Sequence, residues 1–455
     1  MLSPLAGARF VLTPMPAAHF GAGAIGELPG LVRGTGSAMA VIVTDPALAG
    51  SPVVARVRDV LAADGVPSAV FAGVRPNPST DDVAAGADVV AALAAEAGRG
   101  ARVGRVAVVA VGGGSAIDAA KGIALAAVNP QRGRDLDYRR DFAHPALPIV
   151  AVPTTAGTGA ETNAFAVVTD PATLRKFYVG HASSRPAAAI LDPDLTLGLP
   201  PAATAATGMD ALTHALESCM SSRANPWSDG IALQVIRMIA AHLPRAVADG
   251  ADREARSQML LAAHLAGVGM AGTGLGICHA IGHSLGGRFG IAHGVALTMV
   301  LPGVLRFNLP ACRERLASVA FAVGAGDTAR SAGWNAAAAI DAVAALVDTV
   351  GMTHRLPDFG VTAADFGVIT ADALDDEVLA NTPRRPAAAD IRAILAGALD
   401  GSGALEGTGA LEGTGALDGT GALDGTGALD GTGAGKAPTW PTPPTRPGGA
   451  APGGG

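Results

Sequence analysis

Four histidines and an aspartate in the middle of the chain could bind a divalent metal ion. Asp210 and His214 are four residues apart in TGMDALTHALES, and His279 and His283 have the same spacing in CHAIGHSLGG. Residues four apart on a helix project from one face, so each pair would point into one site. His293 follows in GIAHG, where a glycine-rich turn precedes the next helical segment.

Each histidine taken alone is better explained as a buried core residue or a helix cap. This explanation does not suit the five residues taken together, because a carboxylate and several imidazoles come from segments that are otherwise almost free of charge. Carboxylate oxygens and imidazole nitrogens together are a ligand set for divalent transition metals. The sequence therefore predicts a metal site in this half of the chain.

A glycine-rich turn in the first half could bind a phosphate. Val108–Gly122 reads VVAVGGGSAIDAAKG, a strand, a triple-glycine turn and the start of a helix, with Ser115 as a candidate cap and Asp118 in the first turn. Glycines let the backbone approach a ligand closely, and free N–H groups at a helix N-terminus suit a pyrophosphate. The spacing is not GxGxxG, so an ordinary tight turn is the alternative.

Two other strand ends carry polar groups that fit a dinucleotide. The loop 153–163, PTTAGTGAETN, packs hydroxyls and glycines, although a polar loop without function has the same composition. Ligands of open parallel sheets bind beyond the carboxyl ends of the strands, so this loop and the triple-glycine turn should face one crevice. Asp45 ends an earlier strand, where an acid can bind an adenosine ribose and favour NAD over NADP; a cap before Pro46 explains it equally well.

These segments belong to two differently patterned parts of the chain. Early on, continuous apolar runs such as Ala38–Thr44 and Arg105–Val111 alternate with alanine-rich helical stretches, which is typical of a parallel sheet covered on both faces. Later, long helical segments replace the strands. We expect an α/β NAD(P)-binding domain over 1–195 and an all-helical metal-binding, catalytic domain over 196–400. Six hexapeptides related to GALDGT and a Pro/Gly-rich end predict a low-complexity, disordered tail over 401–455.

Composition excludes other classes of protein. The 455 residues carry 32 Lys and Arg against 39 Asp and Glu, a net charge of −7, without a concentrated basic patch, which argues against a nucleic-acid partner. Three scattered cysteines and the lack of a secretory signal pattern favour a reducing cytoplasm. The uncharged run Ser257–Gly287 could span a bilayer by length, but its three histidines favour a buried helix pair and no membrane.

In combination, these motifs resemble the iron-containing (group III) alcohol dehydrogenases. The shared pieces occur in the family's order over about residues 15 to 398, and they are GAGAIGEL, TDPAL, NPS, GGGSAIDAAKG, PTTAGTGAE, LDPDL, TGMDALTHALES, HAIGHSLGG and AHG. The resemblance implies a dehydroquinate synthase-like architecture, with an α/β nucleotide domain, a helical metal domain and a cleft between them. Asn163 stands where the family usually has threonine, which leaves the substrate range open.

The resemblance also implies roles for individual residues. The metal ligands would be Asp210, His214, His279 and His293, whereas His283 would lie near the nicotinamide as the catalytic proton relay. Contacts with NAD, or less favourably NADP, would come from Asp45, Asn77, Gly112, Gly113, Gly114, Ser115, Asp118, Thr154, Thr155, Thr158 and Lys176. The metal would be Fe²⁺, with Zn²⁺ as an alternative that the same ligands accept.

The implied function is a cytoplasmic, homo-oligomeric NAD(P) oxidoreductase that interconverts a small alcohol and its aldehyde or ketone. The metal would polarise the substrate oxygen while hydride passes between the carbinol carbon and the nicotinamide. Two alternatives are a dehydroquinate synthase-like lyase and a keto acid reductase of the maleylacetate reductase type. The lyase is disfavoured, because a phosphorylated acid needs several basic residues and only Arg288 lies within the metal motifs. The same arginine keeps an anionic substrate open.

Overall fold

The structure is a computed structural model that describes residues 10, 12, 15–96 and 105–401. The tail over 402–455, for which the sequence predicts disorder, lies outside the described residues. Within the described part, every strand ends by Leu191 and the first long helix of the second half begins at Pro201. This order agrees with the predicted fold class, and the domain division at residues 195 and 196 stays a prediction.

Among the described residues, six strands form a parallel sheet and two form a separate hairpin. The strands are β1 (Ala17–Phe20), β2 (Met39–Val43), β3 (Ser68–Phe71), β4 (Val106–Gly112), β5 (Ile149–Pro153), β6 (Phe165–Asp170), β7 (Arg175–Gly180) and β8 (Ala188–Leu191). The sheet has the order β1-β8-β5-β4-β2-β3, and β6 pairs with β7 in antiparallel register. Because the six strands run in one direction, the loops after their carboxyl ends share one edge of the sheet.

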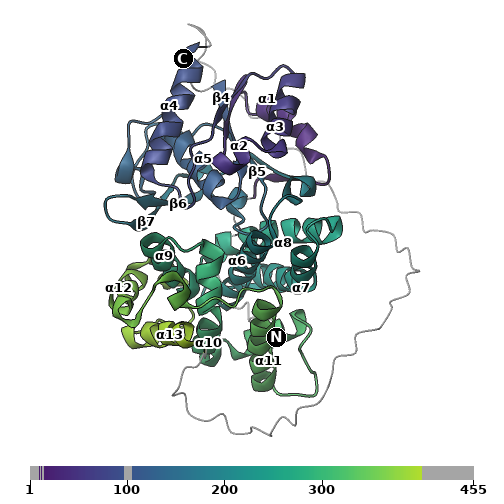
Figure 1. Ribbon diagram of the computed structural model, residues 1–455, viewed down its shortest axis with the longest axis vertical. Helices are drawn as coiled ribbons and strands as arrows, with labels where there is room; N and C mark the ends of the chain where they lie inside the picture. Colours follow the sequence, from purple (N-terminus) through teal and green to yellow (C-terminus); the bar gives the residue numbers. More distant parts are fainter. Residues whose placement is uncertain (1–9, 11, 13–14, 97–104, 402–455) are drawn as a thin grey trace, which may run out of the picture. The chain divides into compact units, whose positions relative to one another are not determined.

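Helices cover both faces of this sheet (Figure 1). They are α1 (Leu28–Gly34), α2 (Pro46–Ala49), α3 (Pro52–Ala63), α4 (Thr80–Glu96) and α5 (Gly114–Ala126). Alternate residues of β4 point to opposite faces, so Val108 packs in a cluster with residues of α4 and α5, whereas Val109 packs with residues of α1 and α3. A strand buried on both faces must be apolar throughout, which explains the unbroken valine and alanine run.

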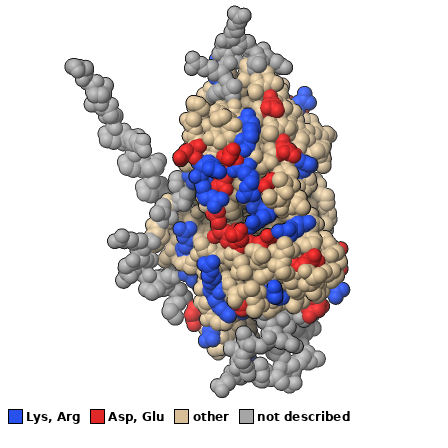
Figure 2. Space-filling model, turned by 90° about the vertical axis from the view of Figure 1, so that its left-hand side faces the viewer, with Lys and Arg blue, Asp and Glu red and all other residues tan. Residues whose placement is uncertain are grey.

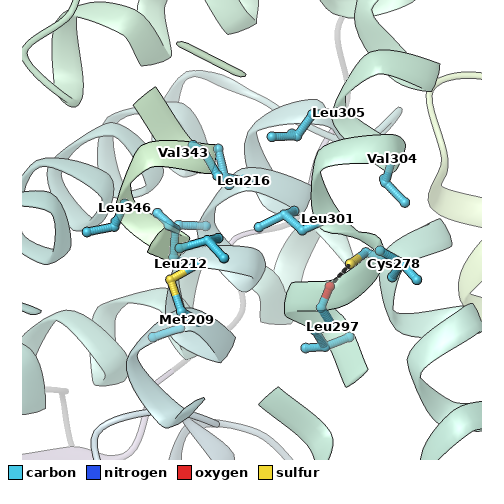
Figure 3. Packing of buried hydrophobic residues seen from close by; sticks show 14 of the residues in the cluster. Met209, Leu212, Leu216, Cys278, Leu297, Leu301, Val304, Leu305, Val343 and Leu346 are labelled. Carbon is cyan, nitrogen blue, oxygen red and sulfur yellow. Dashed lines mark hydrogen bonds between the residues drawn. The ribbon is translucent and has the colours of Figure 1, made fainter. Parts of the chain in front are cut away.

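The second half is a helical bundle. Its helices are α6 (Pro201–Met220), α7 (Pro226–Ala248), α8 (Arg253–Thr273), α9 (Ile277–Phe289), α10 (His293–Ala322), α11 (Ala332–Thr349), α12 (Phe366–Asp375) and α13 (Ala388–Asp400). Figure 3 shows part of its core, where Leu212 of α6, Leu301 of α10 and Val343 of α11 lie close together. Cys278 of α9 is fully buried there and donates its thiol hydrogen to the Leu297 carbonyl at 3.5 Å.

The uncharged run predicted to form a helix pair does so, because α8 and α9 meet at a bend of 109°. Two other described helices, α7 and α10, are long and apolar enough to cross a membrane by length and composition alone. Of the most apolar window of α10, 67% is buried inside the bundle. The outward face of α7 exposes Gln234, Arg237 and Arg245. Packing within the bundle therefore accounts for the apolar composition of α10, whereas 39% of the corresponding window of α7 is buried.

The hairpin of β6 and β7 was not predicted from the sequence. Its second strand, RKFYVG, begins with two basic residues and lacks the continuous apolar pattern of the sheet strands. The short strands β1, at one edge of the sheet, and β8, which lies beside it, were missed as well. The hairpin matters for function, because it places Lys176 and Tyr178 beside α9 and the end of α12.

Candidate metal and cofactor site

Side chains from three helices meet around one carboxylate oxygen. Asp210 and His214 come from α6, His279 from α9, and His293 from the first position of α10. The Oδ1 atom of Asp210 lies 3.5 Å from Nε2 of His214, 3.8 Å from Nε2 of His279 and 3.7 Å from Nε2 of His293. These separations are too long for hydrogen bonds. They suit atoms that would share one metal ion about 2.1 Å from each.

Unpaired polar atoms show that this set fits a cation. Among the described residues, Oδ1 of Asp210 and Nε2 of His279 are buried and have no hydrogen-bond partner. Buried polar atoms are costly unless a donor or an ion satisfies them. The ligand atoms of Asp210, His279 and His293 all lie within 4.8 Å of one another, whereas His214 contacts Asp210 but falls outside this tighter group. Oxygen and imidazole donors in this mixture suit Fe²⁺ or Zn²⁺.

The Asp210 carboxyl is held in its ionised form. Burial by itself raises its pKa, but His214, His293 and His279 together lower that pKa well below the usual range for an aspartate. A metal ligand must be deprotonated, so the site presents a carboxylate without a pH cost near neutrality.

Glu217 is a residue of this centre that the sequence analysis missed. Its carboxylate lies 2.6 Å from Nδ1 of His279 and accepts hydrogen bonds from the backbone N–H groups of Gly276, at 2.8 Å, and Cys278, at 2.7 Å. An ionised carboxylate only accepts, so Nδ1 of His279 carries the hydrogen and Nε2 is left for the metal. Asp210 and Glu217 are seven residues apart on one helix, and this spacing was the signal in the sequence that could have identified Glu217.

The triple-glycine turn and the hydroxyl-rich loop lie against each other at the carboxyl edge of the sheet. A Cβ atom on Gly113 would lie 3.1 Å from the Thr155 hydroxyl, and one on Gly114 would lie 2.5 Å from the Thr158 methyl group. No larger residue fits at Gly114 without moving Thr158. The two segments therefore face one crevice, as the parallel sheet predicts.

Two details of this turn contradict the sequence-based expectation. Helix α5 begins at Gly114 with Gly113 as its N-cap, so Ser115 is the second helical residue and caps nothing. Asp118 lies beyond the first turn, where its Oδ2 accepts a hydrogen bond from the Val167 backbone N–H at 3.0 Å. Gly112, with a φ of +149°, bends the chain at the end of β4, and the extended Gly113 is then the N-cap, so the helix begins one residue before Ser115.

Asp45 caps a helix, which was the alternative to ribose binding that the sequence left open. Its Oδ1 accepts hydrogen bonds from the backbone N–H groups of Ala47, at 2.9 Å, and Leu48, at 3.0 Å, at the start of α2. Its Oδ2 faces the triple-glycine turn, because a Cβ on Gly112 would lie 3.8 Å from that oxygen. One carboxylate oxygen is thus committed to the backbone and the other points toward the predicted cofactor turn.

A cavity of about 530 Å³ joins the two halves of the predicted site. From the α/β side it is lined by Asn77, Gly114, Ser115, Asp118, Thr158 and Lys176, and from the helical side by His214, His279, His283 and His293. The other predicted cofactor residues do not line this cavity, and they are Asp45, Gly112, Gly113, Thr154 and Thr155. Apolar walls come from Phe165, Met270 and Leu275. The space can therefore hold a small, partly apolar molecule beside the metal ligands.

His283 lies next to the ligand histidines without belonging to the group around Asp210. Its ring stacks on that of His293, with centroids 5.7 Å apart and planes 12° from parallel. Nδ1 of His283 lies 2.7 Å from Oδ2 of Asp376. Burial lowers the pKa of His283 in spite of that carboxylate, so the ring is neutral near pH 7. A neutral imidazole can accept a proton.

Comparison with known proteins places the chain in a family. The model for "Iron-containing alcohol dehydrogenase" matches residues 16–193, and that for "Fe-containing alcohol dehydrogenase family, C-terminal" matches residues 204–399. The chain belongs to the iron-containing alcohol dehydrogenases. It is 38% identical to the 1,3-propanediol dehydrogenase of Klebsiella pneumoniae over 83% of this chain and 96% of that protein. It is 35% identical to the NAD-dependent methanol dehydrogenase of Bacillus methanolicus over 84% and 98%.

A solved structure agrees with this assignment. The crystal structure of a 1,3-propanediol oxidoreductase superposes on this iron-containing alcohol dehydrogenase with a TM-score of 0.81 at 37% identity, covering 86% of this chain and all of that one. The predicted family, the two-part fold and the reaction type, oxidoreduction between an alcohol and its carbonyl compound, are thereby confirmed.

The dehydrogenase also contains a fully buried lysine that the sequence analysis did not single out. Lys121 donates hydrogen bonds from Nζ to Oδ1 of Asn163, at 3.1 Å, and to the Phe165 carbonyl, and it lies 3.7 Å from Asp118. Burial lowers the pKa of Lys121, although Asp118 and Glu161 oppose this effect. The amide oxygen of Asn163 is thus occupied inside the protein. The amphipathic pattern of helix α5 in the sequence does not indicate a buried cation.

Arg288 does not serve the cavity of this dehydrogenase. Its guanidinium forms two hydrogen bonds with Asp372, one of them from Nη2 to Oδ1 at 2.9 Å, and it is absent from the residues that line the space beside the metal ligands. Because the charge of Arg288 is already paired with Asp372, this arginine gives no support to the anionic substrate that the sequence left open.

Proposed function

We propose that this protein oxidises small alcohols, or reduces the corresponding aldehydes or ketones, with a divalent metal held by Asp210, His214, His279 and His293. The observation that supports this best is the common cavity, since His214, His279 and His293, which surround Asp210, line it from the helical side and Gly114 and Ser115 of the glycine-rich turn line it from the α/β side. The relatives named for methanol and 1,3-propanediol also suggest short alcohols and diols as substrates. The apolar wall of Phe165, Met270 and Leu275 suits a short carbon chain.

The chain's own residues would hold the reactants and move the proton. A bound Fe²⁺ or Zn²⁺ would supply Lewis acidity at the substrate oxygen, and bound NAD would supply the hydride acceptor. Asn77, Gly114, Ser115, Thr158 and Lys176 line the cofactor side of the cavity. The neutral ring of His283 is placed to take the hydroxyl proton of the alcohol, or to return it when an aldehyde is reduced.

We also propose a cellular compartment, an oligomeric state and a domain division for this protein. All three cysteines are free and buried, which supports a reducing, cytoplasmic setting. The edge strand β1 exposes Phe20, which supports a homo-oligomer built against this edge, to be measured by light scattering. We keep residues 1–195 as the cofactor domain and 196–400 as the metal domain in this proposal.

A spectrophotometric assay tests the proposed function. The purified full chain, stripped of metal and reloaded with Fe²⁺ or Zn²⁺, is mixed with NADH or NADPH and a panel of short aldehydes, hydroxyaldehydes and keto acids. We expect metal-dependent oxidation of NADH with the short neutral aldehydes. If the metal-loaded protein oxidises neither cofactor with any of these compounds, the proposal is wrong.

The variant His283→Ala should separate metal binding from catalysis. We expect it to retain the metal, because His283 lies outside the group around Asp210, and to lose about 10²–10⁴-fold in kcat, the usual contribution of a positioned acid–base group. Metal content by mass spectrometry and kcat with saturating alcohol give the two readings. A variant that loses its metal would mean that His283 is itself a ligand.

Lys176 should make cofactor binding depend on pH. Burial lowers the pKa of Lys176 to about 8, with Asp118, Asp210 and Asp376 opposing this effect. The side chain is a cation below that pH and neutral above it, so an attraction to the dinucleotide is present at low pH and lost as the pH rises through about 8. We expect KM for NAD to rise by roughly tenfold between pH 7 and pH 9, since a hydrogen bond to a charged group contributes about 1.5–3 kcal/mol.

The Lys176→Met variant provides the comparison. It should show the high KM for NAD at every pH, with a flat profile across the same range. A wild-type KM that does not change between these pH values, or a variant that keeps the slope, would contradict this role for Lys176.

A further inference from the structure

Asp376 connects His283 to the opposite side of the cavity. It directly follows the last residue of α12, and its Oδ2 lies 2.7 Å from Nδ1 of His283 on α9. Its Oδ1 accepts hydrogen bonds from the Tyr178 hydroxyl, at 3.2 Å, and from the Val378 backbone N–H, at 3.1 Å. Tyr178 belongs to β7 in the α/β half. One carboxylate therefore holds groups from both halves of the protein.

This arrangement determines which nitrogen of His283 carries a hydrogen. An ionised carboxylate has no donor, so Nδ1 of His283 must donate to Asp376. In the neutral ring, Nε2 is then the only nitrogen with a free lone pair. The Asp376 side chain is 12% exposed and that of His283 is 8% exposed, so water competes little for this hydrogen bond. The ring is left with one tautomer and one orientation.

Neighbouring acids hold the same segment against the α/β half. Asp375 pairs with Arg175 of β7 at 2.5 Å, and Glu377 lies 3.3 Å from Arg139 and also accepts a hydrogen bond from the Tyr138 hydroxyl. Figure 2 shows Lys, Arg, Asp and Glu side chains gathered in a band across this face, where a second cavity of about 380 Å³ lies. Each of these exposed ion pairs contributes little to stability. The buried hydrogen bonds of Asp376 are therefore what fixes the position of this segment.

We propose that Asp376 is a positioning residue for the reaction, which holds His283 with Nε2 free to exchange a proton with the substrate and couples that orientation to β7 through Tyr178. The proposal rests on the proposed dehydrogenase function and deepens it. It assigns Asp376 no contact with substrate, cofactor or metal. The effect of Asp376 is thus exerted through the ring of His283.

The matched variants Asp376→Ala, Asp376→Asn and Asp375→Ala test this assignment in the metal-loaded full-length enzyme. We expect Asp376→Ala to keep its metal and its KM for the alcohol within about twofold while kcat falls by roughly 10–100-fold, the usual effect of removing a residue that orients a functional histidine. Asp376→Asn should recover part of the loss, because its amide oxygen can still accept the hydrogen on Nδ1. Asp375→Ala removes a neighbouring charge that does not touch His283 and should leave kcat within about twofold.

A second pair of variants separates positioning from general stability. Combining Asp376→Ala with His283→Ala should lower kcat no further than His283→Ala does, because both changes act through one ring. Additive losses, equal losses in the Asp375 and Asp376 variants, or loss of metal from Asp376→Ala would each overturn the proposal. Normal turnover by Asp376→Ala would overturn it and leave the proposed function intact, whereas an inactive wild-type enzyme would overturn both.

Discussion

Replacing His279 with alanine is expected to abolish metal retention and turnover together. Its Nε2 is buried, unpaired and 3.8 Å from the Asp210 carboxylate, and its Nδ1 is held by Glu217. Removing the ring takes away one ligand and leaves two carboxylates buried without their partner, which costs several kcal/mol. We expect kcat to fall by more than about 10³-fold, since both Lewis acidity and substrate orientation are lost. Metal content by mass spectrometry and the rate of NADH formation measure the two effects.

A control histidine distinguishes this effect from general damage. His242 lies on α7 and does not line the cavity, so His242→Ala should keep metal content and kcat within about twofold. The weaker variant Glu217→Gln should reduce metal affinity by about 10–100-fold, as outer-shell changes usually do. Turnover by a metal-free His279→Ala protein, or full metal content in it, would be incompatible with the proposed site.

Replacing Gly294 with alanine is expected to damage both stability and the metal site. Gly294 follows His293 in α10, and a Cβ atom there would lie 2.0 Å from the backbone carbonyl oxygen of Ala206 in α6. That oxygen belongs to a helix backbone and cannot rotate away, so α10 and α6 must separate. Overpacking of this kind costs about 1–3 kcal/mol, occasionally more. Because His293 and Asp210 sit on these two helices, metal affinity should fall as well.

Urea titration of the metal-free protein measures the stability, and titration with Zn²⁺ measures the affinity. Gly230→Ala is the matched control, since Gly230 is an exposed residue of α7 with open space around it and alanine is the better helix former by about 1 kcal/mol. We expect the control to be neutral or stabilising. If Gly294→Ala unfolds at the same urea concentration as the wild type, the close approach of the two helices is wrong.

Much of this protein could be predicted because the signals are local. The spacing of Asp210 and His214 on one helix, and the glycines between β4 and α5, depend only on neighbours along the chain. The change from apolar strands to long helices is likewise a local pattern, and it gave the correct fold class. Predictions failed where a shift of one or two residues mattered, as at Ser115, because the bend at Gly112 makes Gly113 the N-cap and the helix begins at Gly114.

The remaining features depend on contacts between distant segments. Asp376 contacts His283, which is 93 residues away in the sequence, and Lys121 contacts Asn163, which is 42 residues away. In the sequence, Asp376 is one of several acids in DALDDEV, and nothing in its neighbours separates it from those that form exposed ion pairs.

By itself, the sequence determined the chemistry that is available, namely an acid, imidazoles and a phosphate-sized turn, because residue type and helical or strand period set these. Only the tertiary structure decided which nitrogen of His279 or His283 is free and which charges are already paired, such as Arg288 with Asp372. The physical reason is that protonation and pairing depend on burial and on the atom a few ångströms away, which packing alone supplies.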